Sequence, residues 1–240
     1  IPKFFKAVGV SELPLTPDEG VETFKSLKLQ INDLAYQEMV AREKAELEKF
    51  NEPLIQCTNL SHTYKGEVEA LKKVNIEIHR GDMVAIIGQN GSGKTTLAKH
   101  FNGLLLPTEG EILVNGKPTR EQGIFSLGKT VGYVFQNPDH QIFSEKVFDE
   151  VAFSPRLRKL PEEEIKQRVL EALSAVGLEG LEEEDPFTLT KSGRQRVAVA
   201  SVLASNPDVL ILDEPTTGLD YSEQSSMMNM VRRLNENGST

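Results

Sequence analysis

A short apolar run followed by a glycine-rich segment constrains this sequence more than any other feature. Met83–Ile87 is apolar and has glycines close to both ends, a pattern that predicts a buried strand. Gly88 follows, and after four intervening residues come Gly93, Lys94 and Thr95. In this phosphate-binding pattern, glycines let successive backbone N–H groups point at phosphate oxygens, and the following helix adds its positive N-terminal end. The sequence therefore predicts a site for a nucleoside triphosphate.

We expect separate roles for the residues of this loop. Lys94 would act on the β- and γ-phosphates, and the Thr95 hydroxyl would ligate Mg²⁺. A glycine-rich turn that matches the pattern by chance is the alternative, and it is disfavoured because a strand pattern precedes the loop and a helical pattern follows it. The other residues expected to bind the phosphates are Gly88, Asn90, Gly91, Ser92, Gly93 and Thr96.

A pair of acids follows the apolar pattern Val209–Leu212 and forms the second half of the predicted site. A carboxylate at the carboxyl end of a strand faces the phosphate loop, so we expect Asp213 to ligate Mg²⁺. Glu214 is then placed to polarise a water against the γ-phosphate. Gln136, at the end of the predicted strand Thr130–Phe135, would ligate Mg²⁺ or hold that water. The alternative, two surface acids on a loop, fits poorly with the apolar residues before them.

Composition excludes several classes of protein. The chain has 240 residues, a net charge of −9 and a pI near 5.1, which argues against DNA or RNA as a partner because such binding needs a basic face. No apolar run approaches the length of a membrane span, so we expect any membrane role to be peripheral. Cys57 is the single cysteine, which excludes an internal disulfide, and we expect it to be buried in a strand. The histidines show no metal-ligand spacing.

Strand and helix patterns alternate along the chain, and this predicts an α/β fold. We expect a P-loop NTPase core with a mixed sheet, an antiparallel β lobe and an α-helical lobe at about residues 137–205. The strand patterns outside the motifs above lie at 54–63, 71–79 and 111–114, and the helical patterns at 94–102, 148–153, 161–176, 193–205 and 222–235.

Several further motifs accompany the loop and the acids. Together they occur in the order and spacing of an ABC transporter nucleotide-binding domain, which the chain resembles from about residue 53 onward. Gln136–Phe143, followed by Glu150–Phe153, is similar to the energy-coupling-factor and cobalt/nickel importer branch, which takes up vitamins and transition-metal ions. The segments that carry the resemblance are Tyr64, Gly88–Thr96, Gln136, Leu189–Arg196, Leu210–Pro215 and Gly218–Asp220.

The resemblance implies an ATPase that uses ATP and Mg²⁺ and energises a membrane importer. It implies that Tyr64 stacks on adenine, and that Gln136 begins a loop that senses the γ-phosphate and touches an integral membrane component. Asp220 would contact a second ATP-binding domain, fused or separate, so that two domains enclose ATP head to tail. The chain would then work as a peripheral protein at the cytoplasmic face of the cell membrane.

One motif departs from the family pattern. In the segment Leu189–Gly193, Thr190 keeps the hydroxyl, whereas Lys191 and Ser192 replace glycines at which bare backbone would approach a phosphate. Thr190, Ser192 and Gly193 are the residues that would bind the nucleotide held by the second domain. We hypothesise that the site completed by this segment hydrolyses ATP slowly.

The two ends of the chain suggest a piece of a larger protein. Residues 1–29 resemble the tail of a preceding domain in tandem importer ATPases, residues 30–52 would be a linker helix, and residues 53–240 would be the second ATP-binding domain, truncated at its C-terminus. The family's switch histidine has no candidate before Thr240. We therefore expect residues 1–240 alone to bind ATP better than they hydrolyse it.

Two other functions stay open at this point. A soluble ABC-type ATPase of translation or DNA maintenance would need basic surface or a long coiled coil before Leu189, and neither is visible. A nucleotide-binding regulatory module that does not hydrolyse ATP would fit the altered segment and the missing histidine. The sequence does not indicate which substrate is transported, because a separate membrane protein would select it.

Overall fold

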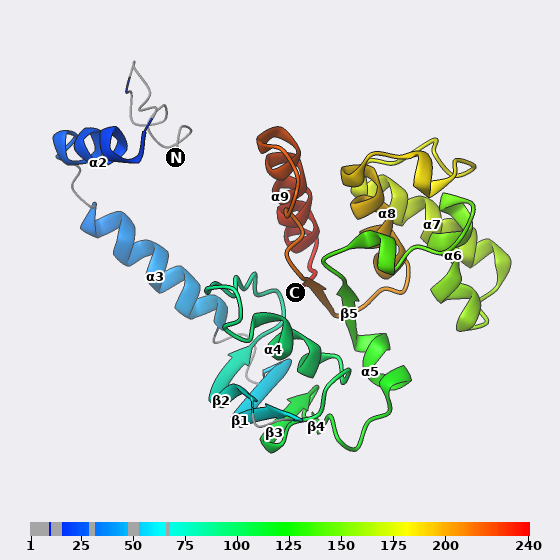
Figure 1. The fold of residues 1–240 in the computed structure, drawn as a ribbon, viewed down its shortest axis with the longest axis horizontal. Coiled ribbons are helices and arrows are strands. Elements are labelled where there is room, and N and C mark those ends of the chain that lie inside the picture. Colours follow the sequence, from blue (N-terminus) through cyan, green and yellow to red (C-terminus); the bar gives the residue numbers. More distant parts are fainter. Residues whose placement is uncertain (1–9, 11–15, 29–31, 48–52, 66–67) are drawn as a thin grey trace. The chain divides into compact units, whose positions relative to one another are not determined.

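The computed structural model describes residues 10, 16–28, 32–47, 53–65 and 68–240. The chain divides into two compact units, residues 1–51 and 52–240, and each is described by itself (Figure 1). In the described part of both units, no helix is long and apolar enough to cross a membrane.

The first unit contains two helices, α2 (Pro17–Ser26) and α3 (Asp33–Leu47). Thr16 caps α2: its hydroxyl accepts from the Glu19 backbone N–H, and the Glu19 carboxylate accepts from the Thr16 N–H, both at 3.3 Å. This reciprocal cap explains why the helix begins at Pro17. Leu34 and Met39 of the second helix are exposed, and Leu34 keeps 69% of its surface accessible.

The second unit begins with an antiparallel sheet in the order β2-β1-β3-β4. Asn115 and Gly116 form a tight turn between the last two strands, and both have positive φ angles, as such two-residue turns require. The strands are β1 (Ile55–Tyr64), β2 (Val68–Ile78), β3 (Glu109–Val114) and β4 (Lys117–Pro118).

The apolar face of this sheet packs against two helices, α4 (Lys94–Phe101) and α5 (Ile124–Thr130), of which the second has no counterpart among the sequence predictions. Leu97 and Phe101 attach α4 to the core, and Leu127 attaches α5. Burying each such side chain contributes about 1.5–3 kcal/mol. The predicted burial of Cys57 is confirmed in this core. The shared core therefore holds the helix that follows the glycine-rich loop.

A parallel pair of strands, β5 (Val131–Val134) and β6 (Val209–Leu212), lies beside this core. Val131 and Val209 contribute side chains to it. The predicted bounds of the second strand are confirmed at both ends. The Asp213 backbone N–H donates to the Val134 carbonyl at 3.1 Å, so the pairing continues to the point where the polar residues begin.

The helical lobe contains α6 (Val147–Leu157), α7 (Glu162–Val176) and α8 (Lys191–Leu203), with short 3₁₀ turns at Pro138–His140 and Pro186–Thr188 (Figure 1). These helices share one core, and α9 (Tyr221–Glu236) packs against it through Met227, Met230 and Leu234. Gly177 ends α7 in the left-handed conformation, at φ +71°, as the sequence predicted.

The prediction of a buried strand at Met83–Ile87 is wrong. The segment has no strand hydrogen bonds in the described structure, and Ile87 is 91% exposed. A strand needs a neighbouring strand to satisfy its backbone groups. The free edge of β6 instead bonds to Thr240, with Leu210 N–H donating to the Thr240 carbonyl at 2.8 Å. An apolar run indicates that burial would be favourable, whereas the available pairing partner decides whether a strand forms.

Two leucines of α7 allow a matched test of the helical core. Leu173 is fully buried and Leu170 is 42% exposed. We expect Leu173→Ala to lower the free energy of unfolding by about 2–5 kcal/mol, because it leaves a cavity, and Leu170→Ala to lower it by less than about 1 kcal/mol. Urea unfolding of both variants measures the difference, and equal losses would contradict this packing.

Candidate nucleotide site

The glycine-rich loop closes around the side chain of Lys94. Its ammonium donates to the backbone carbonyls of Gly88 and Gln89, each at 3.0 Å. Gly93 caps α4 at φ +91°, and a Cβ there would lie 2.5 Å from the Ala70 carbonyl oxygen, so only glycine fits. The predicted phosphate residues Gly88, Asn90, Gly91, Ser92, Gly93, Lys94, Thr95 and Thr96 therefore form one loop and the first turn of a helix.

The start of α4 is suited to an anion. No side chain caps it, so the free backbone N–H groups of its first turn are available to a ligand. These groups carry the positive end of the helix dipole, and Lys94 lies beside them. Backbone N–H groups and one lysine are the donors that a phosphate chain takes in loops of this kind.

Thr95 and Asp213 come together as predicted, although 118 residues separate them in the sequence. The Thr95 hydroxyl donates to Asp213 Oδ1 at 3.0 Å. Tyr133 donates its hydroxyl to the other carboxylate oxygen, Oδ2, at 2.8 Å. A hydroxyl and a carboxylate are hard oxygen ligands of the kind that Mg²⁺ takes together with substrate phosphates, so this pair fits that ion. The sequence analysis missed Tyr133, because only its place in a predicted strand was visible.

Glu214 and Gln136 form a second pair at the same strand ends. The Gln136 amide donates to Glu214 Oε2 at 2.7 Å, and the Thr217 hydroxyl donates to the same oxygen at 3.0 Å. Glu214 adopts a left-handed backbone conformation, at φ 49°, which is uncommon for a residue with a side chain and is found at functional sites. The sequence analysis left two roles open for Gln136, as a ligand of Mg²⁺ or as a partner of the attacking water. The structure places Gln136 against Glu214, and in the described residues no hydrogen bond joins it to Thr95 or Asp213.

Tyr64 lies against the first turn of α4. Its hydroxyl is 3.1 Å from Thr96 Oγ1, while 41% of the residue stays exposed. The ring of His62 packs edge-on against it, with 4.6 Å between centroids. An exposed aromatic face beside the phosphate loop is compatible with adenine stacking, which stays a prediction.

Behind Tyr64, a buried pair of histidines joins β1 to α4. His100 Nδ1 lies 2.7 Å from the Thr96 carbonyl, and His100 Nε2 lies 3.1 Å from His62 Nδ1. Nδ1 of His62 is also 3.2 Å from the Leu106 carbonyl. Burial lowers the pKa of His100, because the charged imidazolium would lose its hydration. The sequence offered no signal for this contact, since the two residues are far apart and belong to different elements.

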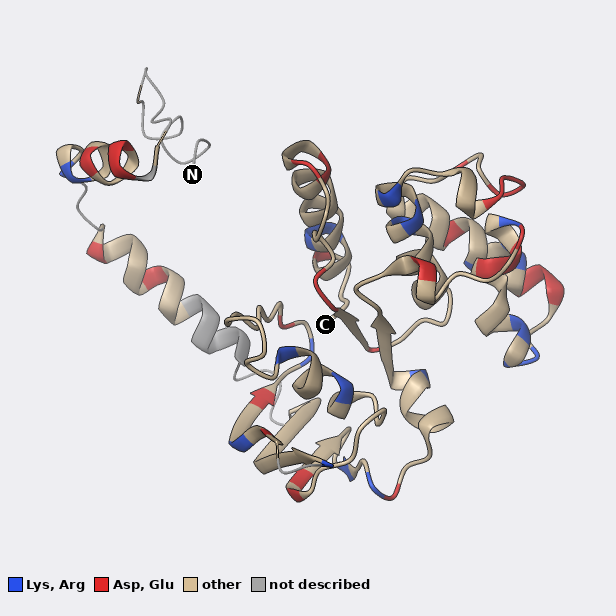
Figure 2. Cartoon of the chain, in the orientation of Figure 1, with Lys and Arg blue, Asp and Glu red and all other residues tan. Residues whose placement is uncertain are grey.

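The altered segment at the start of α8 lies apart from this chain's own phosphate loop, and no hydrogen bond in the described structure joins the two. Thr190 caps α8, with its hydroxyl accepting from Gly193 N–H at 3.1 Å. Lys191 donates to the Thr217 carbonyl at 2.9 Å. Ser192 is buried. In Figure 2, parts of the ribbon at the start of α8 have the colour of Lys and Arg. The contacts of this segment are thus with its own helix and with the residues after β6, and its role at the nucleotide of a second domain stays a prediction.

Asp220, predicted to contact a second domain, caps α9. Its carboxylate accepts from the Glu223 backbone N–H at 2.8 Å, and the Glu223 carboxylate accepts from the Asp220 backbone N–H at 3.2 Å. This cap gives Asp220 a local structural role, and its contact with a second domain stays a prediction.

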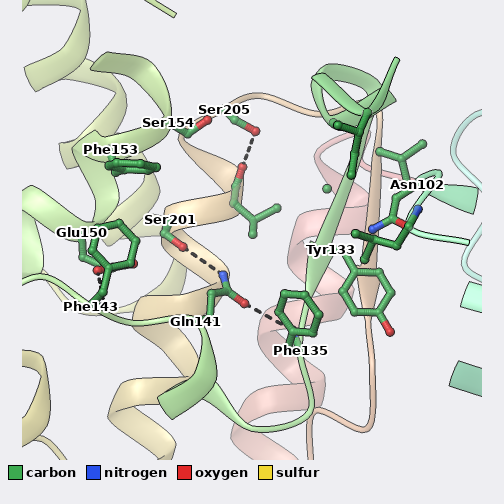
Figure 3. A pocket seen from close by; sticks show the side chains of 16 residues that line it. Asn102, Tyr133, Phe135, Gln141, Phe143, Glu150, Phe153, Ser154, Ser201 and Ser205 are labelled. Carbon is green, nitrogen blue, oxygen red and sulfur yellow. Dashed lines mark hydrogen bonds between the residues drawn. The ribbon is translucent and has the colours of Figure 1, made fainter. Parts of the chain in front are cut away.

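A separate pocket of about 320 Å³ lies between β5, α5, α6 and α8 (Figure 3). Its wall is largely apolar and includes Leu104, Phe135, Phe143 and Phe153. Gln141 crosses it, with its amide donating to Ser201 Oγ at 3.2 Å. No phosphate-loop residue lines this pocket. It therefore adjoins the nucleotide site through β5 without being part of it.

The loop, the helix start and the strand-end acids together define a P-loop nucleotide-binding protein. Comparison with known proteins specifies the family. Residues 71–217 match the family described as ABC transporter. A putative ABC transporter ATP-binding protein of Caldanaerobacter subterraneus is 54% identical over 243 residues, which cover 100% of this chain and 43% of that protein. The energy-coupling factor transporter ATP-binding protein EcfA of Methanocaldococcus jannaschii is 45% identical over 78% of this chain and 68% of its own length.

Solved structures are also similar to the chain. The structure of cbiO1 from Clostridium perfringens, described as part of the ABC transporter complex cbiONQ, has a TM-score of 0.73 at 40% identity and covers 79% of this chain and 76% of its own. A dimeric ATP-binding cassette bound to ADP and Pi has a TM-score of 0.68 at 33% identity, with 78% and 85% covered.

The chain belongs to the ABC transporter family of ATP-binding proteins. Proteins of this family bind ATP, with Mg²⁺ as the usual ion. The predicted fold class is confirmed by these neighbours and by the observed antiparallel sheet and helical lobe. The chain spans less than half the length of the first of these relatives.

The buried His100 makes stability depend on pH. Its pKa in the folded protein lies below the ordinary imidazole value of about 6.5, so below that pH the unfolded chain binds a proton that the native protein does not. We expect the free energy of unfolding to fall as the pH is lowered from 7.5 to 5.5, and to fall less in His100→Gln. Denaturant unfolding at both pH values measures this. Exposed His140→Gln is the matched control, and a wild-type pH response in His100→Gln would contradict the expectation.

Proposed function

We propose that this chain is the ATP-hydrolysing component of a membrane importer for a vitamin or a transition-metal ion. The observation that carries the proposal is the pairing of Thr95, at the start of α4, with Asp213 and of Gln136 with Glu214. Asp213, Gln136 and Glu214 follow the carboxyl ends of the two parallel strands. The importer class is supported by relatives named as energy-coupling factor ATP-binding proteins and by the similarity to a component of cbiONQ.

In this proposal the loop binds and orients the triphosphate. Lys94 exchanges its two carbonyl partners for β- and γ-phosphate oxygens, and the free N–H groups of α4 bind the same chain. Thr95 and Asp213 hold Mg²⁺, which supplies positive charge against the phosphates. These groups stabilise the charge that develops on the phosphate oxygens during transfer.

Glu214 is the proposed base. Among the described residues, Gln136 and Thr217 donate to Glu214, both to Oε2, and in the proposal Oε1 accepts from a water. The water oxygen attacks the γ-phosphorus, the bond to the β–γ bridging oxygen breaks, and ADP and phosphate result. Gln136 acts by holding the carboxylate in place. This assignment makes Lys94, Glu214 and Gln136 the residues on which hydrolysis depends.

A second ATP-binding domain, fused or separate, completes the proposed sites. In the part of the chain that the structure describes, no hydrogen bond joins the segment from Thr190 to Gly193 to its own phosphate loop, which suits a role at the nucleotide of another domain. The dimeric cassettes among the similar structures support this arrangement. In the proposal, residues 1–29 are the tail of a preceding domain, residues 30–52 the linker and residues 53–240 an ATP-binding domain. The greater length of the 54% identical relative is consistent with it.

The proposed membrane partner is an integral transport component that binds at the pocket described above, whose lining includes Phe135, the residue before Gln136. Phe143 and Phe153, which pack edge-on at 4.8 Å, give that pocket an apolar side on which an apolar segment of a partner can be buried. The chain would thereby lie peripherally at the cytoplasmic face of the membrane.

Glu214→Gln tests the proposed base. The amide keeps the size of the side chain but removes its basicity, so we expect ATP hydrolysis by the full-length protein to fall at least about 100-fold while ATP affinity changes little. Phosphate release and calorimetry measure the two quantities. Exposed Glu236→Gln on α9 is the control. Wild-type hydrolysis in Glu214→Gln would contradict the assignment, whereas negligible hydrolysis already in the wild type would favour a regulatory module that only binds nucleotide.

The altered segment predicts unequal sites. The site with Lys94 and Glu214 is completed by the partner's segment, whereas the partner's site is completed by Lys191 and Ser192. We expect Glu214→Gln to remove most of the ATPase rate and the equivalent change in the partner domain to remove little. The two rates are compared in the assembled protein, and equal losses would defeat the hypothesis.

A further inference from the structure

The carboxylate of Asp213 is held at both of its oxygens. Thr95 donates to Oδ1, and the Tyr133 phenol donates to Oδ2 at 2.8 Å. Tyr133 is 8% exposed, so little water competes for this bond. The phenol is thus a fixed partner of the carboxylate, on the side opposite the threonine.

The register of the parallel strands explains how Tyr133 reaches Asp213. Tyr133 pairs with Ile211, and side chains two residues apart on a strand point to the same face of the sheet. Tyr133, Ile211 and Asp213 therefore share one face. The tyrosine side chain is long enough to reach from the level of Ile211 to Asp213, two residues further along that face. Ile211 packs into the same core as α4, so this is also the face on which Thr95 lies.

The phenol remains a donor under ordinary conditions. A phenol carries its proton at neutral pH, so the Tyr133 hydroxyl donates and the ionised carboxylate accepts. A carboxylate with Oδ2 bound in this way has its plane fixed, and Oδ1 stays directed at the Thr95 hydroxyl. Removing a residue that hydrogen-bonds to a metal ligand typically lowers metal affinity by about 10–100-fold.

We propose that Tyr133 is a positioning residue for Mg²⁺: by donating to Oδ2 it holds Asp213 in the orientation in which Oδ1 and Thr95 face the ion. This inference rests on the proposed function, because it assumes that Asp213 and Thr95 serve the Mg²⁺ of bound ATP. It adds a residue that no motif of the sequence indicated.

The test uses Tyr133→Phe in the full-length protein, with the non-hydrolysable ATP analogue AMP-PNP as the probe. Calorimetry measures analogue affinity in EDTA and at increasing Mg²⁺. We expect the affinity in EDTA to match the wild type, and the Mg²⁺ concentration for half-maximal gain in affinity to rise about 10-fold or more. Tyr36→Phe removes an exposed hydroxyl from the other compact unit and is the matched control.

An unchanged Mg²⁺ requirement in Tyr133→Phe would overturn the inference and leave the proposed function intact. An equal loss of affinity with and without Mg²⁺ would also overturn it, since that loss would reflect packing alone. If the wild type gains no affinity from Mg²⁺, the proposed function fails and the inference fails with it.

A second measurement does not depend on the folding of Tyr133→Phe. Residues 1–240 contain four tyrosines and no tryptophan, so the triple variant Tyr36→Phe, Tyr64→Phe, Tyr221→Phe of residues 1–240 leaves Tyr133 as the reporting tyrosine. Mg²⁺ draws charge from the carboxylate to which the phenol donates. We expect a shift in near-ultraviolet tyrosine absorption when Mg²⁺ is added to the analogue complex, and no shift would overturn the inference.

Discussion

Parallel pairing of β5 with β6 is the interaction on which the candidate site depends. Four residue pairs in register set where each strand ends, and the two carboxyl ends lie side by side because the strands run in the same direction. Gln136 can therefore reach Glu214, and Tyr133 can reach Asp213. A slip of one residue would turn the side chains of one strand to the opposite face and break both contacts.

The residues after β6 connect the two halves of the proposed chemistry. Thr217 donates its hydroxyl to Glu214, and its carbonyl accepts from Lys191 at the start of α8. Gly218 lets the lysine approach, because a Cβ there would lie 2.4 Å from the ammonium nitrogen. The base proposed for this chain's nucleotide and the segment proposed for another domain's nucleotide thus share one threonine. Two hydrogen bonds through Thr217 therefore connect the altered segment with Glu214.

Local signals explain which elements could be predicted from the sequence. Thr16 at a helix start and Gly177 at a helix end act on neighbouring backbone groups, so their effect is readable from adjacent residues. Val209–Leu212 was predicted at both ends because its apolar side chains stop where the acids begin. Met83–Ile87 has an equally clear apolar pattern and forms no strand, because hydrogen bonds to a neighbouring strand are not supplied by the segment itself.

The sequence by itself determined the chemistry of the site: a glycine-rich loop with Lys94 and Thr95, and two acids after an apolar strand, are residue types and spacings that suit a triphosphate with Mg²⁺. Only the tertiary structure decided the partners of these groups. Tyr133 lies 80 residues from Asp213, and Gln136 lies 78 from Glu214. Contacts between such distant residues follow from strand register and from a shared core, which local patterns do not encode.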